Sequence, residues 1–294
     1  MTFPSFLGIG AMRSGTSWLD VQLRTHPDIY MPERRKEVHF FDDYYDRGDD
    51  WYSKFFPSDA EADKWSAIGE ISPRYLFDLN VPDRIHRMLP DSKLIAILRN
   101  PVDRAYSQYG LSLKKAGETG TFSDFIERSP DAFGKGLYFH QLRRYFDLFP
   151  PENILVLIFE RVHGGDRDLA LKRIAEFLNV DPNGFPEHDV KTQVAKSHRA
   201  RFPRASALAT RGAKFIRDLD QDWIVNLAKS VGVPRLFGNS GPIPALEWDA
   251  RLDLFERYAD DINSLEQLIG EDLAHWRPTI TDAEQPESPI KTAA

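Results

Sequence analysis

The chain has 294 residues and a formal net charge of −7, with 41% hydrophobic and 28% charged residues. This composition is ordinary for a globular protein, and its acidic balance argues against broad attraction to nucleic acid. Cysteine is absent, which excludes disulfides, thiolate metal sites and cysteine nucleophiles.

Four short runs rich in β-forming residues are predicted strands, at residues 3–9, 67–71, 93–98 and 153–159. The last two are almost continuously apolar, as in strands buried on both faces of a parallel sheet. Apolar residues at helical spacing predict helices at 138–149, 170–178 and 252–269. This alternation predicts an α/β fold, a three-layer sandwich with a central parallel sheet flanked by helices. Ligands are expected at the carboxyl ends of its strands.

We predict one domain over residues 1–278, because no internal repeat or long linker interrupts the pattern. Residues 279–294, TITDAEQPESPIKTAA, have the composition of a disordered tail. No apolar run approaches the roughly 20 residues of a membrane-spanning helix, and the first residues lack the basic region of a signal peptide. We therefore expect no membrane span and a cytoplasmic location.

A glycine-rich loop, within FLGIGAMRSGTSWL, follows the first predicted strand and opens a helix. Gly10 and Gly15 have the spacing of a phosphate-binding loop, in which backbone N–H groups and the helix dipole favour an anion. Thr16 occupies the position of the lysine that reaches the β/γ-phosphates in nucleoside triphosphatases, and the nearby cation is Arg13. The loop thus predicts a site for one phosphate. A glycine turn without a ligand is the alternative, which this cation and three neighbouring hydroxyls disfavour.

The strand KLIAIL runs directly into RNPVDRAYS. Asn100 can cap the following helix and Pro101 suits its first turn. Arg99 then lies at the strand's carboxyl end, and Ser107 lies about two turns into the helix. A magnesium-dependent nucleotide enzyme commonly has an aspartate near such a strand end, whereas an arginine repels Mg²⁺ and attracts phosphate. These residues predict a second phosphate site; the alternative is a surface arginine paired with Asp103 or with another carboxylate of the chain.

Together the two segments resemble the sulfotransferases that use 3′-phosphoadenosine 5′-phosphosulfate (PAPS), which have a P-loop-like fold. The resemblance implies that Arg99 and Ser107 hold the donor's 3′-phosphate and that PAP, the 3′,5′-bisphosphate, is the product, with no metal required. It also explains the missing loop lysine, since this donor carries no triphosphate. The residues that it implies for the 5′-phosphosulfate are Arg13, Ser14, Gly15, Thr16 and Ser17.

A third segment, RKEVHFFD at residues 35–42, resembles the Lys-Glu-x-His-Phe-Phe-Asp stretch of heparan-sulfate-type sulfotransferases. The resemblance implies that Glu37 is the general base and that His39 orients or assists it. An acceptor hydroxyl must lose its proton as it attacks sulfur, and a carboxylate beside an imidazole can accept that proton. Lys36 and Asp42 are expected to shape the acceptor site. A solvated charge run beside a buried phenylalanine pair is the alternative.

Two later segments depart from the family pattern. In GEISPRY, Ile71 replaces the lysine that the family uses to position donor and acceptor, and Arg74 could substitute from a neighbouring position. The family's late basic loop corresponds to residues 196–204, where Arg199 and Arg201 are expected to cover the anionic cofactor. Acceptor specificity is expected within residues 181–246, which show no interpretable pattern.

The sequence therefore predicts a sulfotransferase that uses PAPS and also assigns Arg13 a catalytic role at the departing phosphate. Its acceptor is a hydroxyl or amine on a glycan, glycolipid or small metabolite, and neither nucleic acid nor metal is expected. The eight histidines are scattered without ligand spacing. A P-loop kinase and a non-catalytic nucleotide-binding protein are the alternatives, and oligomeric state is not indicated.

Overall fold

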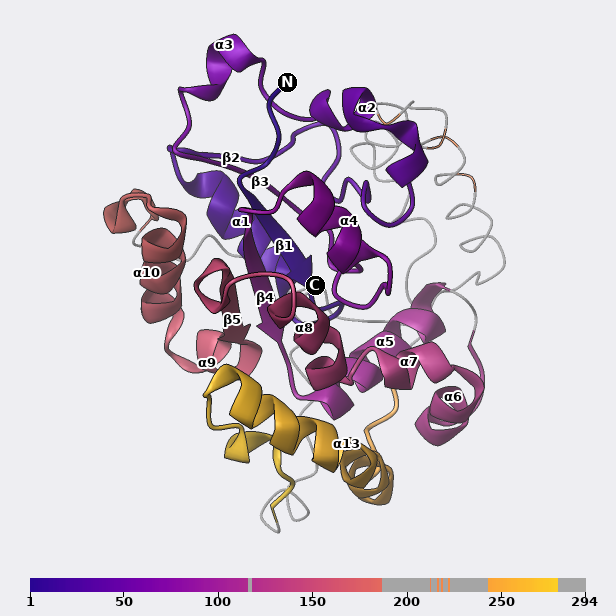
Figure 1. Cartoon of the computed structure of the whole chain (residues 1–294). Helices are drawn as coiled ribbons and strands as arrows, with labels where there is room; N and C mark the ends of the chain where they lie inside the picture. The colour runs from indigo at the N-terminus through magenta and orange to yellow at the C-terminus, as the bar shows by residue number, and fades with distance from the viewer. Residues whose placement is uncertain are drawn as a thin grey trace.

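A parallel five-stranded sheet forms the centre of the protein (Figure 1). The computed structural model describes residues 1–115, 118–186 and 243–279, with Gly212, Ile216, Asp218 and Asp222 between them. Within these ranges the strands are β1 (Phe6–Gly10), β2 (Ile29–Tyr30), β3 (Ala67–Ile71), β4 (Lys93–Leu98) and β5 (Ile154–Ile158). Their order is β2-β3-β1-β4-β5, and every pairing is parallel. The predicted fold class is confirmed, and only the two-residue β2 was not expected.

Helices connect and cover these strands. In the described parts of the chain the α-helices are α1 (Thr16–Thr25), α2 (Asp49–Ser53), α3 (Asp59–Ala62), α4 (Val81–Met88), α5 (Pro101–Lys115), α6 (Phe122–Arg128), α7 (Pro130–Gly134), α8 (Tyr138–Phe146), α9 (Phe159–Gly164), α10 (Arg167–Leu178) and α13 (Trp248–Ile269). The three helices predicted from apolar spacing correspond to α8, α10 and α13. The last of them ends at Gly270, whose left-handed conformation is typical of a helix C-terminus. None of the described helices has the length and apolar character needed to cross a membrane.

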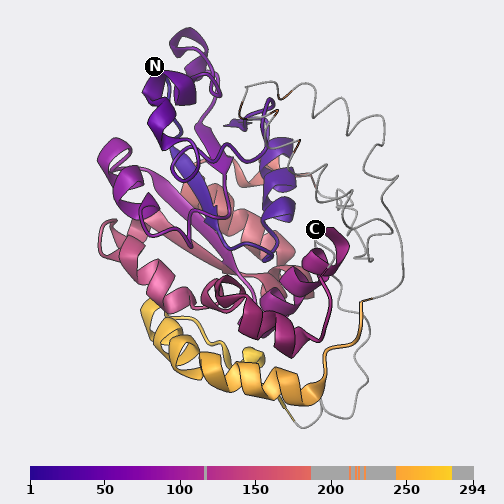
Figure 2. The same ribbon diagram turned by 90° about the vertical axis from the view of Figure 1, so that its right-hand side faces the viewer.

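Two apolar cores lie on opposite faces of the sheet. Along β4, Leu94, Ala96 and Leu98 belong to one core, and Ile95 and Ile97 belong to the other, because alternate side chains of a strand point to opposite faces. The first core is covered by α4, α5, α8 and α13, and the second by α1 and α10. Figures 1 and 2 show α13, in yellow, running along one end of the molecule, where it contacts α5 and α8.

The strand order decides which loops meet. Because β1 lies between β3 and β4, the loops that follow these three strands open at the same edge of the sheet. The Ala11 N–H donates to the Ile97 carbonyl at 2.8 Å, which holds the start of the glycine loop against the end of β4. This places both predicted phosphate sites side by side.

Candidate active site

The glycine loop turns tightly between β1 and α1. Gly15 has φ of 96° and Arg13 has φ of 70°, both in the left-handed region that disfavours most side chains. A Cβ atom on Gly15 would lie 2.8 Å from Cδ2 of Phe159, so glycine is required here by contact as well as by conformation. Ser14 is fully buried at the centre of this turn.

Arg13 links the two segments that the sequence assigned to separate phosphates. Its Nε and Nη2 donate to Oγ of Ser107 at 3.1 and 3.0 Å. Burial lowers the pKa of Arg13, and the nearby positive charges of Arg99 and Arg104 lower it further. The guanidinium groups therefore form one positively charged site at the ends of β1 and β4, instead of two distant ones.

Arg99 is buried, with only 2% of its surface exposed. Its guanidinium lies 4.8 Å above the Phe159 ring, while Nε and Nη1 have no hydrogen-bond partner within the described residues. Asp103 is instead paired with Arg251 at 2.7 Å, so the alternative of a surface arginine paired with Asp103 is wrong. Buried charged donors normally have acceptors, and a phosphate group fits this arrangement.

The segment after Arg99 is held by two residues that sequence reasoning missed. Asn100 caps α5 by accepting from the Val102 N–H at 3.0 Å, as predicted, and its Nδ2 donates to the Trp276 carbonyl at 2.9 Å. Glu160 accepts from the Asn100 N–H at 2.8 Å and from Trp276 Nε1 at 3.0 Å. The only sequence signal for Glu160 is its position just after a predicted strand, and Trp276 gives no comparable signal.

Lys36 joins the RKEVHFFD segment to the glycine loop. Its Nζ donates to Oγ of Ser17 at 2.8 Å, and Ser17 lies in the first turn of α1. The next residue, Glu37, is 41% exposed at its side chain. A partly accessible carboxylate is therefore carried by the residue next to the one that bonds the predicted 5′-phosphate loop.

His39 lies between two carboxylates. Its Nε2 is 3.3 Å from Glu37 Oε2, and its Nδ1 is 3.0 Å from Asp42 Oδ2. Burial lowers the pKa of His39, but the hydrogen bonds and negative charges of Asp42 and Glu37 outweigh this effect and raise it to about 9. At neutral pH both ring nitrogens therefore donate, and the imidazolium holds the Glu37 carboxylate in one orientation.

The structure gives Asp42 a different position from the one expected. Its carboxylate is fully buried and bonds His39, the Arg74 guanidinium at 3.1 Å and the Asp43 N–H at 2.7 Å. Burial raises the pKa of Asp42, but these partners outweigh burial and lower it overall. Asp42 thus orients His39 and Arg74, and the predicted contact with an acceptor needs correction because no part of its carboxylate is exposed.

Arg74 lies beside the RKEVHFFD segment, where its guanidinium pairs with Asp42. Its guanidinium also pairs with Asp43 at 2.7 Å, and 35% of the side chain is exposed. Ile71 is fully buried beside Gly8, in the core that α1 and α10 cover. It therefore cannot fill the role of the family lysine. Arg199 and Arg201 lie outside the described residues, as do residues 280–294 of the predicted tail.

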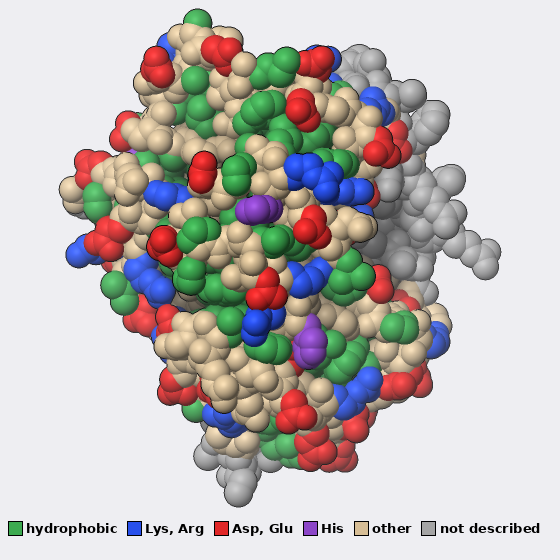
Figure 3. All heavy atoms as spheres, viewed as in Figure 1, with side chains coloured by type: hydrophobic (Ala, Val, Ile, Leu, Met, Phe, Trp, Pro, Cys, Tyr) green, Lys and Arg blue, Asp and Glu red, His purple; other side chains and the backbone are tan. Residues whose placement is uncertain are grey.

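On the face drawn in Figure 3, acidic and basic side chains are interspersed without one large patch of either sign. In the described ranges no cluster of three histidine or acidic side chains could hold a metal ion. The groups predicted to bind an anion, Arg13, Ser14 and Arg99, are largely buried.

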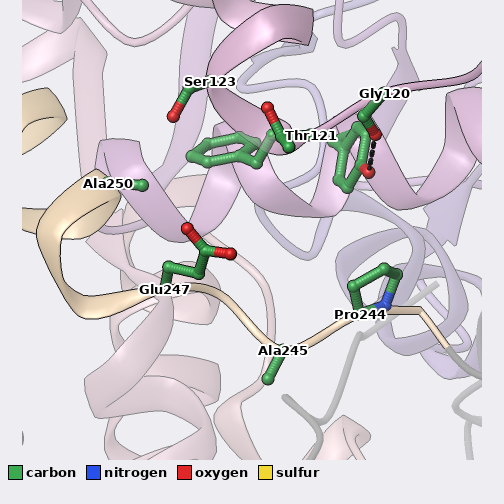
Figure 4. Close-up of a pocket in the computed structure, with 9 residues that line it drawn as sticks. Gly120, Thr121, Ser123, Pro244, Ala245, Glu247 and Ala250 are labelled. Carbon is green, nitrogen blue, oxygen red and sulfur yellow. Dashed lines mark hydrogen bonds between the residues drawn. The ribbon is translucent and has the colours of Figure 1, made fainter.

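A separate cavity of about 130 Å³ lies between α5, α6 and the residues preceding α13 (Figure 4). Tyr109, which donates to the Gly120 carbonyl at 2.7 Å, and Phe122 form part of its wall, with Pro244 and Glu247 on the other side. This volume is below the roughly 300 to 1,000 Å³ of small-molecule sites. The cavity is therefore too small for a nucleotide.

Comparison with known proteins agrees with this geometry. The model of the sulfotransferase domain family matches residues 4–226. Heparan sulfate glucosamine 3-O-sulfotransferase 6 of Homo sapiens is 33% identical over 186 residues, which cover 60% of this chain and 53% of that protein. Membrane-associated sulfotransferase kil1 of Dictyostelium discoideum is 39% identical over 114 residues, covering 39% and 24%. The chain thus spans about half, or less, of the length of these curated relatives.

A solved structure covers more of the fold. A sulfotransferase from Alicyclobacillus acidocaldarius aligns with 95% of this chain and 100% of its own, at a TM-score of 0.69 and 26% identity. The sheet and its surrounding helices are therefore shared with a sulfotransferase over nearly the whole length.

Proposed function

The chain belongs to the PAPS-dependent sulfotransferase family, and from this premise we propose that it transfers a sulfuryl group from PAPS to a hydroxyl or amine of an acceptor. One observation supports the proposal: Lys36, the residue before Glu37, donates to Ser17 at the start of α1. The reaction needs a proton acceptor close to an anion site, and this bond links the segment that holds Glu37 and His39 to the predicted phosphate loop.

In this proposal one group of residues binds the donor's phosphates and another accepts the acceptor's proton. PAPS, when bound, supplies the sulfuryl group. Arg13, with Ser107, would hold its phosphates, together with the Arg99 donors that have no partner among the described residues. Arg13 also supplies positive charge where negative charge develops on the departing phosphate. Glu37 would accept the acceptor's proton, while His39, held by Asp42, keeps that carboxylate in place.

We propose a hydroxyl-bearing glycan as the acceptor. The support is the RKEVHFFD segment and the similarity to proteins named as heparan sulfate glucosamine 3-O-sulfotransferases. Incubation with labelled PAPS and panels of glycans, glycolipids and small hydroxyl- or amine-bearing metabolites tests this. Transfer confined to glycolipids or metabolites would overturn the acceptor class but not the reaction.

The substitution Glu37→Gln tests the base. It keeps the side chain's shape but removes the proton acceptor, so turnover should fall by roughly 10²- to 10⁴-fold. The affinity for PAP, measured by calorimetry, should change little because the two loops hold it. Near-normal turnover would show that another group is the base. A wild type that binds PAP but transfers no sulfuryl group would instead favour a non-catalytic nucleotide-binding protein.

A further inference from the structure

Glu70 is a fully buried carboxylate beneath the Glu37–His39 pair, and no motif assigned it a role. It lies on β3 with 0% exposure, and it forms no ion pair within the described residues. Its Oε1 accepts from the hydroxyls of Tyr52 at 3.1 Å and Tyr75 at 2.7 Å. Its Oε2 accepts from the Ser72 hydroxyl at 2.7 Å and the Val38 N–H at 3.4 Å.

Two of these hydroxyls also hold the backbone of the catalytic segment. The His39 N–H donates to Ser72 Oγ at 3.0 Å, and the Phe41 N–H donates to the Tyr75 hydroxyl at 3.3 Å. With the direct bond from Val38, three amides of residues 37–42 are bound to Glu70 or to a hydroxyl that Glu70 binds. His39 has φ of 58°, a strained conformation that needs such support.

The carboxylate also sets the direction of these hydrogen bonds. Burial raises the pKa of Glu70, although the hydrogen bonds from Tyr75, Ser72 and Tyr52 and the nearby charge of His39 act to lower it. In the structure the Ser72 and Tyr75 hydroxyls both donate to the carboxylate. Each hydroxyl then presents a lone pair to an amide N–H. A neutral amide at position 70 could donate to the Ser72 or the Tyr75 hydroxyl. That hydroxyl could then point its own hydrogen toward the backbone N–H that it now accepts from, and this N–H would lose its acceptor.

We propose that Glu70 is a positioning residue that holds Glu37 and His39 in their reactive orientation through Ser72 and Tyr75. Glu70 is too deeply buried to touch an acceptor. The inference rests on the proposed function, since it concerns the geometry of the base in that reaction. It assigns the GEISPRY segment a role in orienting the base, in addition to any contact that Arg74 makes.

Three hydroxyl deletions separate positioning from general stability. Tyr52→Phe and Tyr75→Phe each remove one buried hydroxyl from Glu70 Oε1, but only the Tyr75 hydroxyl holds a catalytic-segment amide. Ser72→Ala removes the other hydroxyl that links Glu70 to a backbone amide, that of His39. We expect Ser72→Ala and Tyr75→Phe to lower kcat by about tenfold or more, as small misplacements of catalytic groups do. Tyr52→Phe should lower it less than about threefold, with PAP affinity and KM for PAPS unchanged in all three.

A second readout does not depend on activity. Titration of the His39 ring by NMR should show a midpoint near 9 in the wild type and in Tyr52→Phe. It should fall by one unit or more in Ser72→Ala, because a displaced ring loses its carboxylate partners. Glu70→Gln should reproduce the loss of kcat while retaining PAP binding.

The outcomes distinguish the two proposals. If the wild type transfers no sulfuryl group to any acceptor, the proposed function fails, and the NMR comparison still tests the positioning role. If Tyr52→Phe loses as much kcat as Tyr75→Phe, or if the His39 midpoint is the same in all variants, Glu70 serves stability alone and the inference is overturned.

Discussion

Arg99 keeps a positive charge in the interior while two of its N–H groups lack an acceptor within the described residues. Such a charge destabilises a folded protein unless a partner neutralises it. We expect this buried cation to favour the binding of an anion at the end of β4. The same cation should lower the free energy of unfolding of the ligand-free protein.

The substitution Arg99→Met tests whether Arg99 favours PAP binding while it lowers the stability of the ligand-free protein. It replaces the buried cation with an apolar chain of similar length, so the free energy of unfolding without ligand should be unchanged or higher. The dissociation constant for PAP should rise roughly 10- to 100-fold because charged hydrogen bonds are lost, whereas adenosine 5′-phosphosulfate should be affected much less. Urea denaturation and calorimetry measure the two quantities.

Arg104 provides the matched control. It is equally buried, but it donates to Gln108 at 2.7 Å and to the Ala132 carbonyl. Arg104→Met should therefore lose more stability and less affinity than Arg99→Met. Equal losses for ligands with and without the 3′-phosphate would refute the assignment of Arg99.

At the scale of elements, the start of α1 packs against the junction between β5 and α9. A Cβ added to Gly15 would lie 2.8 Å from the Phe159 ring, so the two residues are close. The same ring lies beneath the Arg99 guanidinium and stacks on His163 with ring centroids 4.0 Å apart. A shift of α1 would therefore be transmitted to Arg99. The two predicted phosphate segments are coupled through an aromatic ring from a third strand end.

Gly15→Ala should reveal this coupling. The new Cβ adds a steric conflict with Phe159 to the backbone strain at φ of 96°, and overpacking of this kind typically costs about 1–3 kcal/mol. The control Gly270→Ala has similar left-handed strain at φ of 65° but nothing within 4 Å of the new Cβ, so about 1 kcal/mol is expected. Thermal unfolding with and without PAP should show that only Gly15→Ala impairs binding. Intact binding in Gly15→Ala would disprove the coupling.

At the scale of the whole molecule, a buried ion pair joins residues 187 positions apart. Arg35 donates to Asp222 through Nε and Nη2, both at 2.9 Å, and the two side chains are 4% and 3% exposed. The guanidinium also lies over the rings of Tyr44 and Trp51 at 5.1 and 5.5 Å. This pair holds Asp222 against the residue that precedes Lys36 and Glu37.

Asp222→Asn should destabilise the fold strongly. It removes the negative charge that faces a buried guanidinium, a change that typically costs about 3–5 kcal/mol. Asp218→Asn is the control, because Asn can still accept from the Tyr44 hydroxyl, and it should cost about 1 kcal/mol or less. Urea denaturation measures both changes in the free energy of unfolding. Similar values for the two variants would show that the buried Arg35–Asp222 pair does not contribute more stability than the Asp218 hydrogen bond.

The sequence by itself determined the class of fold and the segments that carry the chemistry. Strand and helix periods, the spacing of Gly10 and Gly15, and polar residues placed directly after strands are local features. They located β1, β3, β4 and β5 to within a few residues and indicated the 13–17, 35–42 and 99–107 segments.

Only the tertiary structure decided how these segments meet. The Arg13–Ser107 and Lys36–Ser17 hydrogen bonds, the inward position of Asp42 and the support from Glu70 join parts of the chain that no local spacing relates. They depend on β1 lying between β3 and β4. Strand order is set by the packing of the whole sheet and its helices, so it brings together at one edge side chains that the sequence can only name separately.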